Sequence, residues 1–419
     1  MKASIGIFSS LRTVAERSHN GKMGIFSSPI TYLGRTTFRN RGVPFGIKES
    51  DRLSHMYVIG RTGTGKSTLL EALMRQDIGQ GKGMALLDPH GDLAEKIVGA
   101  LPDRRKEDLV YFNAADPAQP YGYNPLKRVV KDKRPLAASG LLEVMKKMWD
   151  DAWGPRMEHI LRNALLVLLD QEHVTLPDIL RLFHDDVFRK RVGAECTNLQ
   201  VKAFWLTEYP KYSYRLRADG IMPIQNKVGA FLANPILYRI LAEPEKTLNF
   251  RRIMDEGRIL VINLAKGKIG EDSTALLGGL LVTTLSLAAF SRAEVAETKR
   301  HNFFLYMDEF QYFTTLSMAN MTAELRKYHV GLILANQFLD QLEPEVRDAI
   351  LGNVGTLVSF RVGPKDASLI AKEFDPTFEP TDLLNLPNYH IYLKLMIDGA
   401  PSKAFSGVTL QPAEGIKGE

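Results

Sequence analysis

Cysteine, metal-ligand spacings and an N-terminal apolar run are nearly or wholly missing from this sequence of 419 residues. Cys196 is the single cysteine, so the chain can form neither an internal disulfide nor a cysteine-based metal site, which fits a reducing compartment. The nine histidines include no His-x-x-x-His pair, which argues against a zinc centre. Charged residues interrupt positions 1–20, so we expect no signal peptide.

One uncharged stretch, 273–291, is nearly long enough to cross a bilayer. Glycine, threonine and serine dilute its apolar residues, and strand-like segments lie on both sides of it. We therefore predict a core helix buried against a sheet rather than a membrane span. The expected location is cytoplasmic, or peripheral at the inner face of the cell membrane.

The bulk composition is that of an ordinary globular protein, with 45% hydrophobic and 24% charged residues. The length exceeds that of one average domain, which favours a domain that carries an insertion. Lysine and arginine total 54 against 48 aspartate and glutamate residues, giving a net charge of +6. This mild excess permits a polyanionic partner but does not require one.

Strand-like and helical segments alternate over most of the chain. A strand at 56–59, a helix to about residue 77 and a strand at 84–88 form a βαβ unit, which predicts a parallel sheet. Further strands are expected at 109–112, 259–264, 303–307, 331–335, 356–360 and 390–397.

The segment 135–250 breaks this alternation, because its apolar residues recur every three or four positions, as in a helix. The pentapeptide Gly-Ile-Phe-Ser-Ser occurs at 6–10 and again at 24–28, which either marks two similar strands or is chance. The predicted organisation is a β-rich segment at 1–53, the first part of an α/β domain at 54–134, an all-helical insertion at 135–250, the second part of the α/β domain at 251–410 and a tail at 411–419.

The segment Gly60-Arg61-Thr62-Gly63-Thr64-Gly65-Lys66-Ser67 matches the P-loop pattern completely, and it lies between a predicted strand and a predicted helix. Glycines let successive backbone amides point at a β-phosphate, and the positive end of the following helix adds to the attraction. Lys66 would bridge the β- and γ-phosphates, and the Ser67 hydroxyl would bind Mg²⁺. We therefore predict ATP binding by Gly60, Thr62, Gly63, Thr64, Gly65, Lys66, Ser67 and Thr68.

Two later strands end in polar residues suited to the same triphosphate. Asp308 and Glu309 follow the strand at 303–307, where Asp308 would hold the metal and Glu309 would polarise the attacking water. Alone, two acids after an apolar run also fit a solvated turn, but the P-loop favours the catalytic interpretation. Asn336 and Gln337 end the next strand, where an amide could sense the γ-phosphate or hold the water, or simply form a turn.

Two further motifs have alternative interpretations that the residues leave open. Arg326 and Lys327 end the helix before the strand at 331–335, where cations also stabilise a helix terminus. Arg326 could instead cross a subunit boundary and neutralise charge in the neighbouring site. Asp88 and His90 close the second strand at the ligand-binding edge of a parallel sheet, or they form a plain turn.

The sequence indicates the residues that would contact DNA less clearly than it indicates the nucleotide site. Lys266 and Lys268 flank Gly267 after the strand at 259–264, an arrangement suited to gripping phosphates. Basic residues also gather at 189–191 and 127–134. Most such runs are solvated faces, so each remains one hypothesis among several.

Together, these motifs resemble the HerA/FtsK superfamily of P-loop motors, and within it the branch of type IV coupling proteins and related conjugation ATPases. The resemblance follows motif order from Val58 to Val408: the P-loop, the turn at 88–92, the helical insertion, the Asp308-Glu309 strand and the Asn336-Gln337 strand, then Asn353 and 360–361. It implies a RecA-like P-loop NTPase fold with a mostly parallel central sheet. The sequence departs from the usual coupling protein in showing no N-terminal membrane helices, which leaves docking onto a membrane complex open.

The resemblance further implies a homohexameric ring that moves single- or double-stranded DNA with ATP and Mg²⁺. Arg326 matches the trans-acting arginine of coupling proteins. Relaxosome or secretion-channel proteins are the implied partners. Two rival functions remain: a secretion ATPase for protein export or pilus assembly, and a nucleotide-dependent switch or scaffold with little turnover, against which an intact Glu309 argues.

Overall fold

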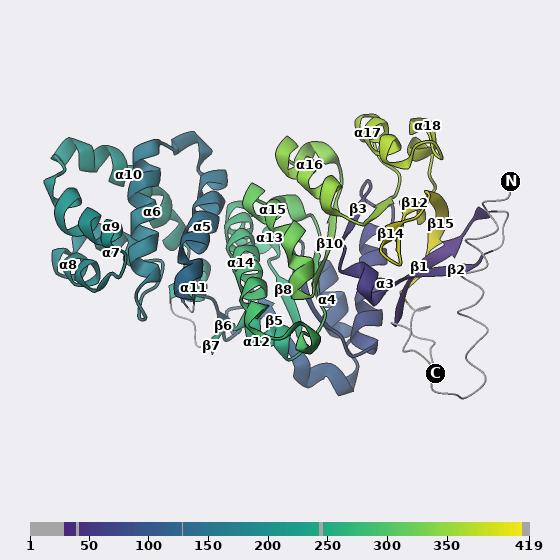
Figure 1. The fold of residues 1–419 in the computed structure, drawn as a ribbon, viewed down its shortest axis with the longest axis horizontal. Coiled ribbons are helices and arrows are strands. Elements are labelled where there is room, and N and C mark those ends of the chain that lie inside the picture. The colour runs from purple at the N-terminus through teal and green to yellow at the C-terminus, as the bar shows by residue number, and fades with distance from the viewer. Residues whose placement is uncertain (1–28, 39–41, 128, 243–245, 413–419) are drawn as a thin grey trace.

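The computed structural model describes residues 29–38, 42–127, 129–242 and 246–412 (Figure 1). The repeated pentapeptide and most of the predicted tail lie outside these residues. The molecule is elongated: the helices of the insertion gather at one end, and β1, β2 and β15 lie at the other (Figure 1).

One 11-stranded sheet organises the chain. From β11 to β5 every neighbouring pair is parallel, whereas the pairs from β2 to β11 are antiparallel. The predicted α/β fold with a mostly parallel central sheet is therefore confirmed. In spatial order the strands are β2 (Pro44–Lys48), β1 (Ile30–Thr36), β15 (Phe405–Thr409), β12 (His390–Lys394), β11 (Thr356–Ser359), β3 (Met56–Ile59), β10 (Val330–Asn336), β9 (Phe303–Met307), β4 (Gly83–Asp88), β8 (Ile259–Asn263) and β5 (Leu109–Asn113).

The antiparallel side corrects one detail of the sequence prediction. The strand expected at 390–397 is two strands, because β12 ends at Lys394 and β13 (Met396–Ile397) pairs instead with β14 (Ala400–Pro401). Asp398 and Gly399 take the left-handed backbone that a tight hairpin requires. The N-terminal β segment extends the main sheet through the pairing of β1 with β15.

Helices cover both faces of the parallel strands, whose residues are therefore apolar on both sides. On β4, Met84 and Leu86 belong to the hydrophobic core beneath α3 and α4, while Ala85 and Leu87 belong to the core on the other face. The helices of the α/β domain are α2 (Glu49–Arg52), α3 (Lys66–Gly79), α4 (Asp92–Gly99), α12 (Phe250–Asp255), α13 (Lys266–Ile269), α14 (Glu271–Ser291), α15 (Leu316–Leu325), α16 (Pro344–Asn353), α17 (Pro364–Phe374) and α18 (Pro380–Leu384).

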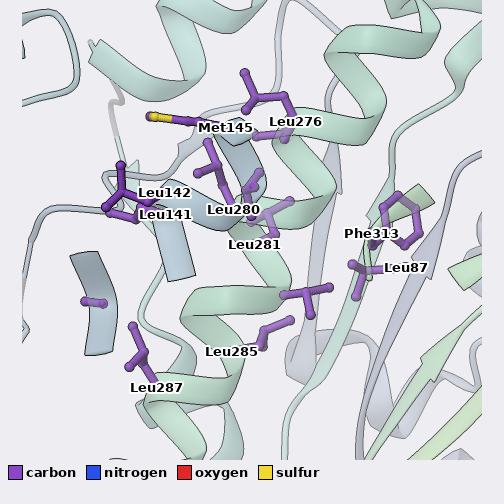
Figure 2. Close-up of a cluster of buried hydrophobic side chains, with 14 of the residues drawn as sticks. Leu87, Leu141, Leu142, Met145, Leu276, Leu280, Leu281, Leu285, Leu287 and Phe313 are labelled. Carbon is purple, nitrogen blue, oxygen red and sulfur yellow. The ribbon is translucent and has the colours of Figure 1, made fainter. Parts of the chain in front are cut away.

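The helix α14 contains the apolar stretch at 273–291, for which the sequence predicts a core helix rather than a membrane span. It is long and apolar enough to cross a membrane, but most of it is buried inside the protein, as predicted for a core helix. Its leucines pack between α5 of the insertion and Leu87 of the sheet (Figure 2). A methyl group at Gly278 would lie 2.2 Å from the Phe313 ring, and one at Gly279 would lie 2.9 Å from Val144 of α5. Glycine therefore lets both neighbours approach α14 closely.

The insertion is a bundle of helices, as expected. Near its end, β7 (Lys246–Thr247) pairs with β6 (Tyr121–Gly122), so the range 135–250 also contains one short strand. The exact domain boundaries remain predictions. The helices are α5 (Arg134–Met148), α6 (Pro155–Leu169), α7 (Asp178–His184), α8 (Asp186–Glu195), α9 (Leu199–Ala203), α10 (Tyr214–Leu232) and α11 (Pro235–Ala242).

Candidate nucleotide-binding and catalytic site

The P-loop connects the carboxyl end of β3 to the first residue of α3, Lys66. Gly63 and Gly65 have φ angles of 76° and 120°, which side-chain-bearing residues rarely adopt. A methyl group at Gly60 would lie 2.5 Å from the Phe360 Cβ atom, so the loop also needs glycine for space. The glycine spacing thus curls the backbone at the start of a helix, as phosphate binding requires.

Lys66 is buried, and its Nζ atom donates to the Gly60 carbonyl at 2.5 Å. Burial lowers the pKa of this ammonium, while the nearby Glu309 and Asp308 carboxylates raise it. A positive group held among acids inside a glycine loop is placed to meet an incoming polyanion. The structure therefore puts Lys66 where the P-loop motif predicts it.

Asp308 follows β9 and lies beside the P-loop, because β9 and β3 flank β10 in the sheet. The Ser67 hydroxyl donates to Asp308 Oδ2 at 3.3 Å. Burial raises the pKa of Asp308 to about 7, with smaller contributions from the Glu309 and Asp88 charges. A buried carboxylate among other acids is electrostatically costly, and a cation would offset that cost.

The donor set fits Mg²⁺ with a nucleotide. A hydroxyl and a carboxylate are oxygen ligands, and Mg²⁺ usually takes one or two carboxylates, completing its shell with water and substrate phosphates. Within the described part of the chain, no three His, Cys, Asp or Glu side chains gather as a metal cluster. The residues therefore suit a metal that arrives with a triphosphate, held by Ser67 and Asp308.

The Glu309 side chain is buried, and its carboxylate accepts hydrogen bonds from two side-chain amides. Its backbone is left-handed, with φ of 46°, which turns the chain sharply after Asp308. Gln337 Nε2 donates to one carboxylate oxygen and Gln311 Nε2 to the other, each at 2.9 Å. Thr62 of the P-loop donates to Gln337 Oε1 at 2.9 Å. Gln337 thus links the phosphate loop directly to the candidate general base.

The structure separates the two amides that end β10. Asn336 is fully buried and accepts from the Tyr57 hydroxyl at 2.7 Å, so it secures the core rather than the site. Gln337 lies between Glu309 and the P-loop, and its role there remains a prediction. Asp88 accepts from the backbone amides of His90 and Ala94, both at 2.9 Å, and therefore closes the turn into α4.

Arg326 lies in the short helix η10 (Arg326–Tyr328), just before β10. Gln337 directly follows the opposite end of β10, at the edge of the sheet that carries the P-loop. Because β10 has 7 residues, its length places Arg326 about 23 Å from the nucleotide site of its own chain. Arg326 is exposed and makes no side-chain hydrogen bond or ion pair with another described residue. It therefore cannot reach the triphosphate site of its own chain.

Lys266 and Lys268 follow β8 at the same sheet edge as the P-loop. Lys268 is exposed, whereas Lys266 Nζ donates to the Tyr312 hydroxyl at 2.7 Å. Tyr312 lies three residues after Glu309. The candidate DNA contacts are thus close to the catalytic loop, and their role remains a prediction.

Sequence reasoning missed Gln311, although its position two residues after Glu309 was a usable signal. It also missed the hydroxyl of Tyr57, because a tyrosine inside an apolar strand gives no sign of its partner. The structure brings Lys66, Ser67, Asp308, Glu309 and Gln337 together, and it places Arg326 at the opposite edge.

Comparisons with known proteins agree with this geometry. The family model described as the central domain of helicase HerA matches residues 31–282. No curated protein matches the sequence significantly. The structure is similar to the bacterial conjugative coupling protein TrwB, with a TM-score of 0.65 and 17% identity over 93% of this chain and 90% of that chain.

A TrwB structure in complex with ADP and Mg²⁺ gives a TM-score of 0.63 at 17% identity, covering 93% of this chain and 97% of that chain. VirB4 of Thermoanaerobacter pseudethanolicus gives 0.62 at 15% identity, covering 93% and 98%. These likenesses show a shared fold, and the family model spans more than half of the sequence. The chain therefore belongs to the family of the helicase HerA central domain, and its fold is similar to those of TrwB and VirB4.

Proposed function

We propose that this protein is a ring-forming motor that hydrolyses ATP with Mg²⁺ at subunit interfaces in order to move DNA. The convergence of the P-loop with Asp308, Glu309 and Gln337 on one sheet edge carries the proposal. ATP with Mg²⁺ supplies the scissile phosphoanhydride bond and the metal that neutralises its charge.

The residues of the chain divide the remaining work. Lys66 neutralises phosphate charge, and Ser67 with Asp308 holds the metal. Glu309 accepts a proton from the attacking water. Gln337 orients the Glu309 carboxylate, and the hydrogen bond between Gln337 and Thr62 couples that carboxylate to the phosphate loop. Positioning and charge stabilisation are what a phosphoryl-transfer site has to provide.

A ring is supported by the position of Arg326. The guanidinium is exposed and lies about 23 Å from the nucleotide site of its own chain, so Arg326 could reach a triphosphate only in another copy of the chain. In a head-to-tail ring, the sheet edge that carries Arg326 in one copy would face the sheet edge that carries the P-loop in the next copy. We infer that Arg326 acts in trans.

DNA is the proposed substrate of the motor. The family description, helicase HerA, and the coupling-protein fold support it, as do the cationic loop residues Lys266 and Lys268 at the nucleotide edge. DNA should raise the steady-state ATPase rate of the purified protein at low salt. Equal rates with and without DNA, together with no DNA binding, would refute the DNA-motor proposal.

A secretion ATPase is the second candidate, supported by the similarity of the fold to VirB4, with a TM-score of 0.62 against 0.65 for TrwB. It predicts ATP hydrolysis that ignores nucleic acid and co-purification with secretion-channel subunits. In both cases we propose a location in the cytoplasm or at the inner membrane face, because the apolar helix α14 is buried in the core.

Subunit mixing tests the shared site. Arg326→Ala chains keep a complete Glu309 site, and Glu309→Gln chains keep an intact arginine. If active sites are shared, mixing the two inactive proteins should restore ATPase activity. Mixtures that stay inactive would refute action in trans.

A further inference from the structure

His55 occupies an unusual position at the edge of the sheet opposite the nucleotide. It immediately precedes β3, is only 3% exposed, and has a φ of 66°, in the left-handed region that residues other than glycine adopt uncommonly. Its backbone carbonyl accepts from the Thr356 amide at the start of β11. A buried histidine in a strained backbone is held there by its surroundings.

Both ring nitrogens of His55 bond main-chain atoms of other elements. Nδ1 accepts from the Leu332 amide of β10 at 3.1 Å, so the ring proton is on Nε2. Nε2 then donates to the Thr322 carbonyl of α15 at 2.7 Å. The neutral ring fits its environment, because burial and the nearby Arg326 charge lower the pKa of His55 to about 4, against the Thr322 bond.

Thr322 belongs to the last turn of α15, one turn before Arg326. Carbonyl groups at a helix C-terminus point out of the helix and accept bonds from other groups. The imidazole therefore fixes the end of α15 from which Arg326 projects. The Arg326 guanidinium makes no hydrogen bond or ion pair with another residue in the described part of the chain, so its direction depends on this helix end.

We propose that His55 is a positioning residue that holds the last turn of α15 and thereby aims Arg326 at the active site of the neighbouring subunit. The inference rests on the trans-acting arginine proposed above. It also connects two sites of one chain, because β3 carries His55 before its first residue and Gly60 after its last. The helix that presents Arg326 is thus hydrogen-bonded, through Thr322, to the residue that precedes the strand leading into the P-loop of the same chain.

Two substitutions separate the two ring bonds. The amide of His55→Gln reaches the Nε2 position and can still donate to Thr322, while Leu332 loses its acceptor. The shorter His55→Asn can still accept from Leu332, while Thr322 loses its donor. Each variant leaves one buried main-chain group unpaired, so their melting temperatures should fall by similar amounts.

We expect His55→Asn to lower kcat by about tenfold or more, with KM for ATP within about twofold of the wild type, because a catalytic group displaced by about 1 Å can cost up to a hundredfold in rate. His55→Gln should stay within about threefold of wild-type kcat. A purely structural role predicts the reverse order, because asparagine tolerates positive φ better than glutamine. A glutamine variant whose kcat falls by about tenfold or more from the wild type would overturn the inference, whether or not the asparagine chain folds.

His329→Asn is the matched control. His329 is also left-handed and lies three residues after Arg326, but its ring bonds no group of α15 among the described residues. Its substitution should leave kcat within about twofold. A loss equal to that of His55→Asn would show that any disturbance near η10 suffices, and would overturn the specific role of His55.

Mixed rings locate the defect. His55→Asn chains should regain activity when mixed with Glu309→Gln chains, which supply a well-placed arginine, but not when mixed with Arg326→Ala chains, which supply none. Activity with Arg326→Ala chains but not with Glu309→Gln chains would place the defect in the nucleotide site of the His55→Asn chain itself, and would overturn the inference. If Arg326→Ala and Glu309→Gln chains fail to complement each other, the trans arginine itself is wrong, and this proposal falls with it.

Discussion

The buried histidine makes a prediction about stability that needs neither nucleotide nor DNA. The pKa of His55 is about 4 in the folded chain, against 6.5 for an ordinary histidine. Between these values the unfolded chain binds a proton that the folded chain does not. Stability from this group is therefore complete above pH 6.5 and is lost as the pH falls to about 4.

The magnitude follows from the shift. A difference of about 2.5 pKa units, at 1.36 kcal/mol per unit, corresponds to about 3 kcal/mol. Asp308 acts in the opposite direction over the whole of this window, because its raised pKa makes the folded chain bind the extra proton. The contribution of His55 must therefore be measured as a difference between the wild type and a variant that lacks the ring.

Urea unfolding at a series of pH values provides that difference. At pH 7 the wild type should be more stable than His55→Asn by about 1–3 kcal/mol, since the variant leaves the Thr322 carbonyl unpaired. Towards pH 4 the advantage should shrink by about 3 kcal/mol, and His55→Gln should show the same trend. A difference that stays constant from pH 7 to pH 4 in both variants would refute the assignment of a buried neutral imidazole.

Three other substitutions test the site and the core. Lys66→Ala should abolish nucleotide binding or turnover, measured by calorimetry and phosphate release, because it removes the buried ammonium of the P-loop. Glu309→Gln should still bind ATP but lower kcat by about a hundredfold or more, which a single-turnover assay would see as persistent ATP. Asp77→Ala should cost about 3–5 kcal/mol in urea unfolding, because it leaves the fully buried Arg52 guanidinium without the carboxylate that it binds through both terminal nitrogens. A loss below about 1 kcal/mol would contradict that last assignment.

The nucleotide edge was predictable because its signals are local. The P-loop spans eight consecutive positions, and Asp308 and Glu309 directly follow an apolar strand. Parallel strands place their carboxyl ends at one edge, so order along the chain was enough to predict proximity in space. The structure added the amide contacts of Gln337 and Gln311, whose geometry depends on the left-handed turn at Glu309.

The antiparallel side and the role of His55 were not predictable from pattern. β15 is half-buried and interrupted by glycine, so its residues alternate weakly. The function of His55 depends on contacts with Thr322 and Leu332, both about 270 residues away in sequence. Neither periodicity nor a short motif reports on such a distant pairing.

The two glycines of α14 have a consequence for how the insertion and the catalytic loop move. Gly278 touches the Phe313 ring, four residues beyond Glu309, and Gly279 touches Val144 of α5 on the other side. Close-packed interiors have low compressibility, so a load applied to α5 cannot be absorbed at these contacts. A force on the helical bundle is thus transmitted through α14 to the segment that carries the candidate catalytic residue Glu309.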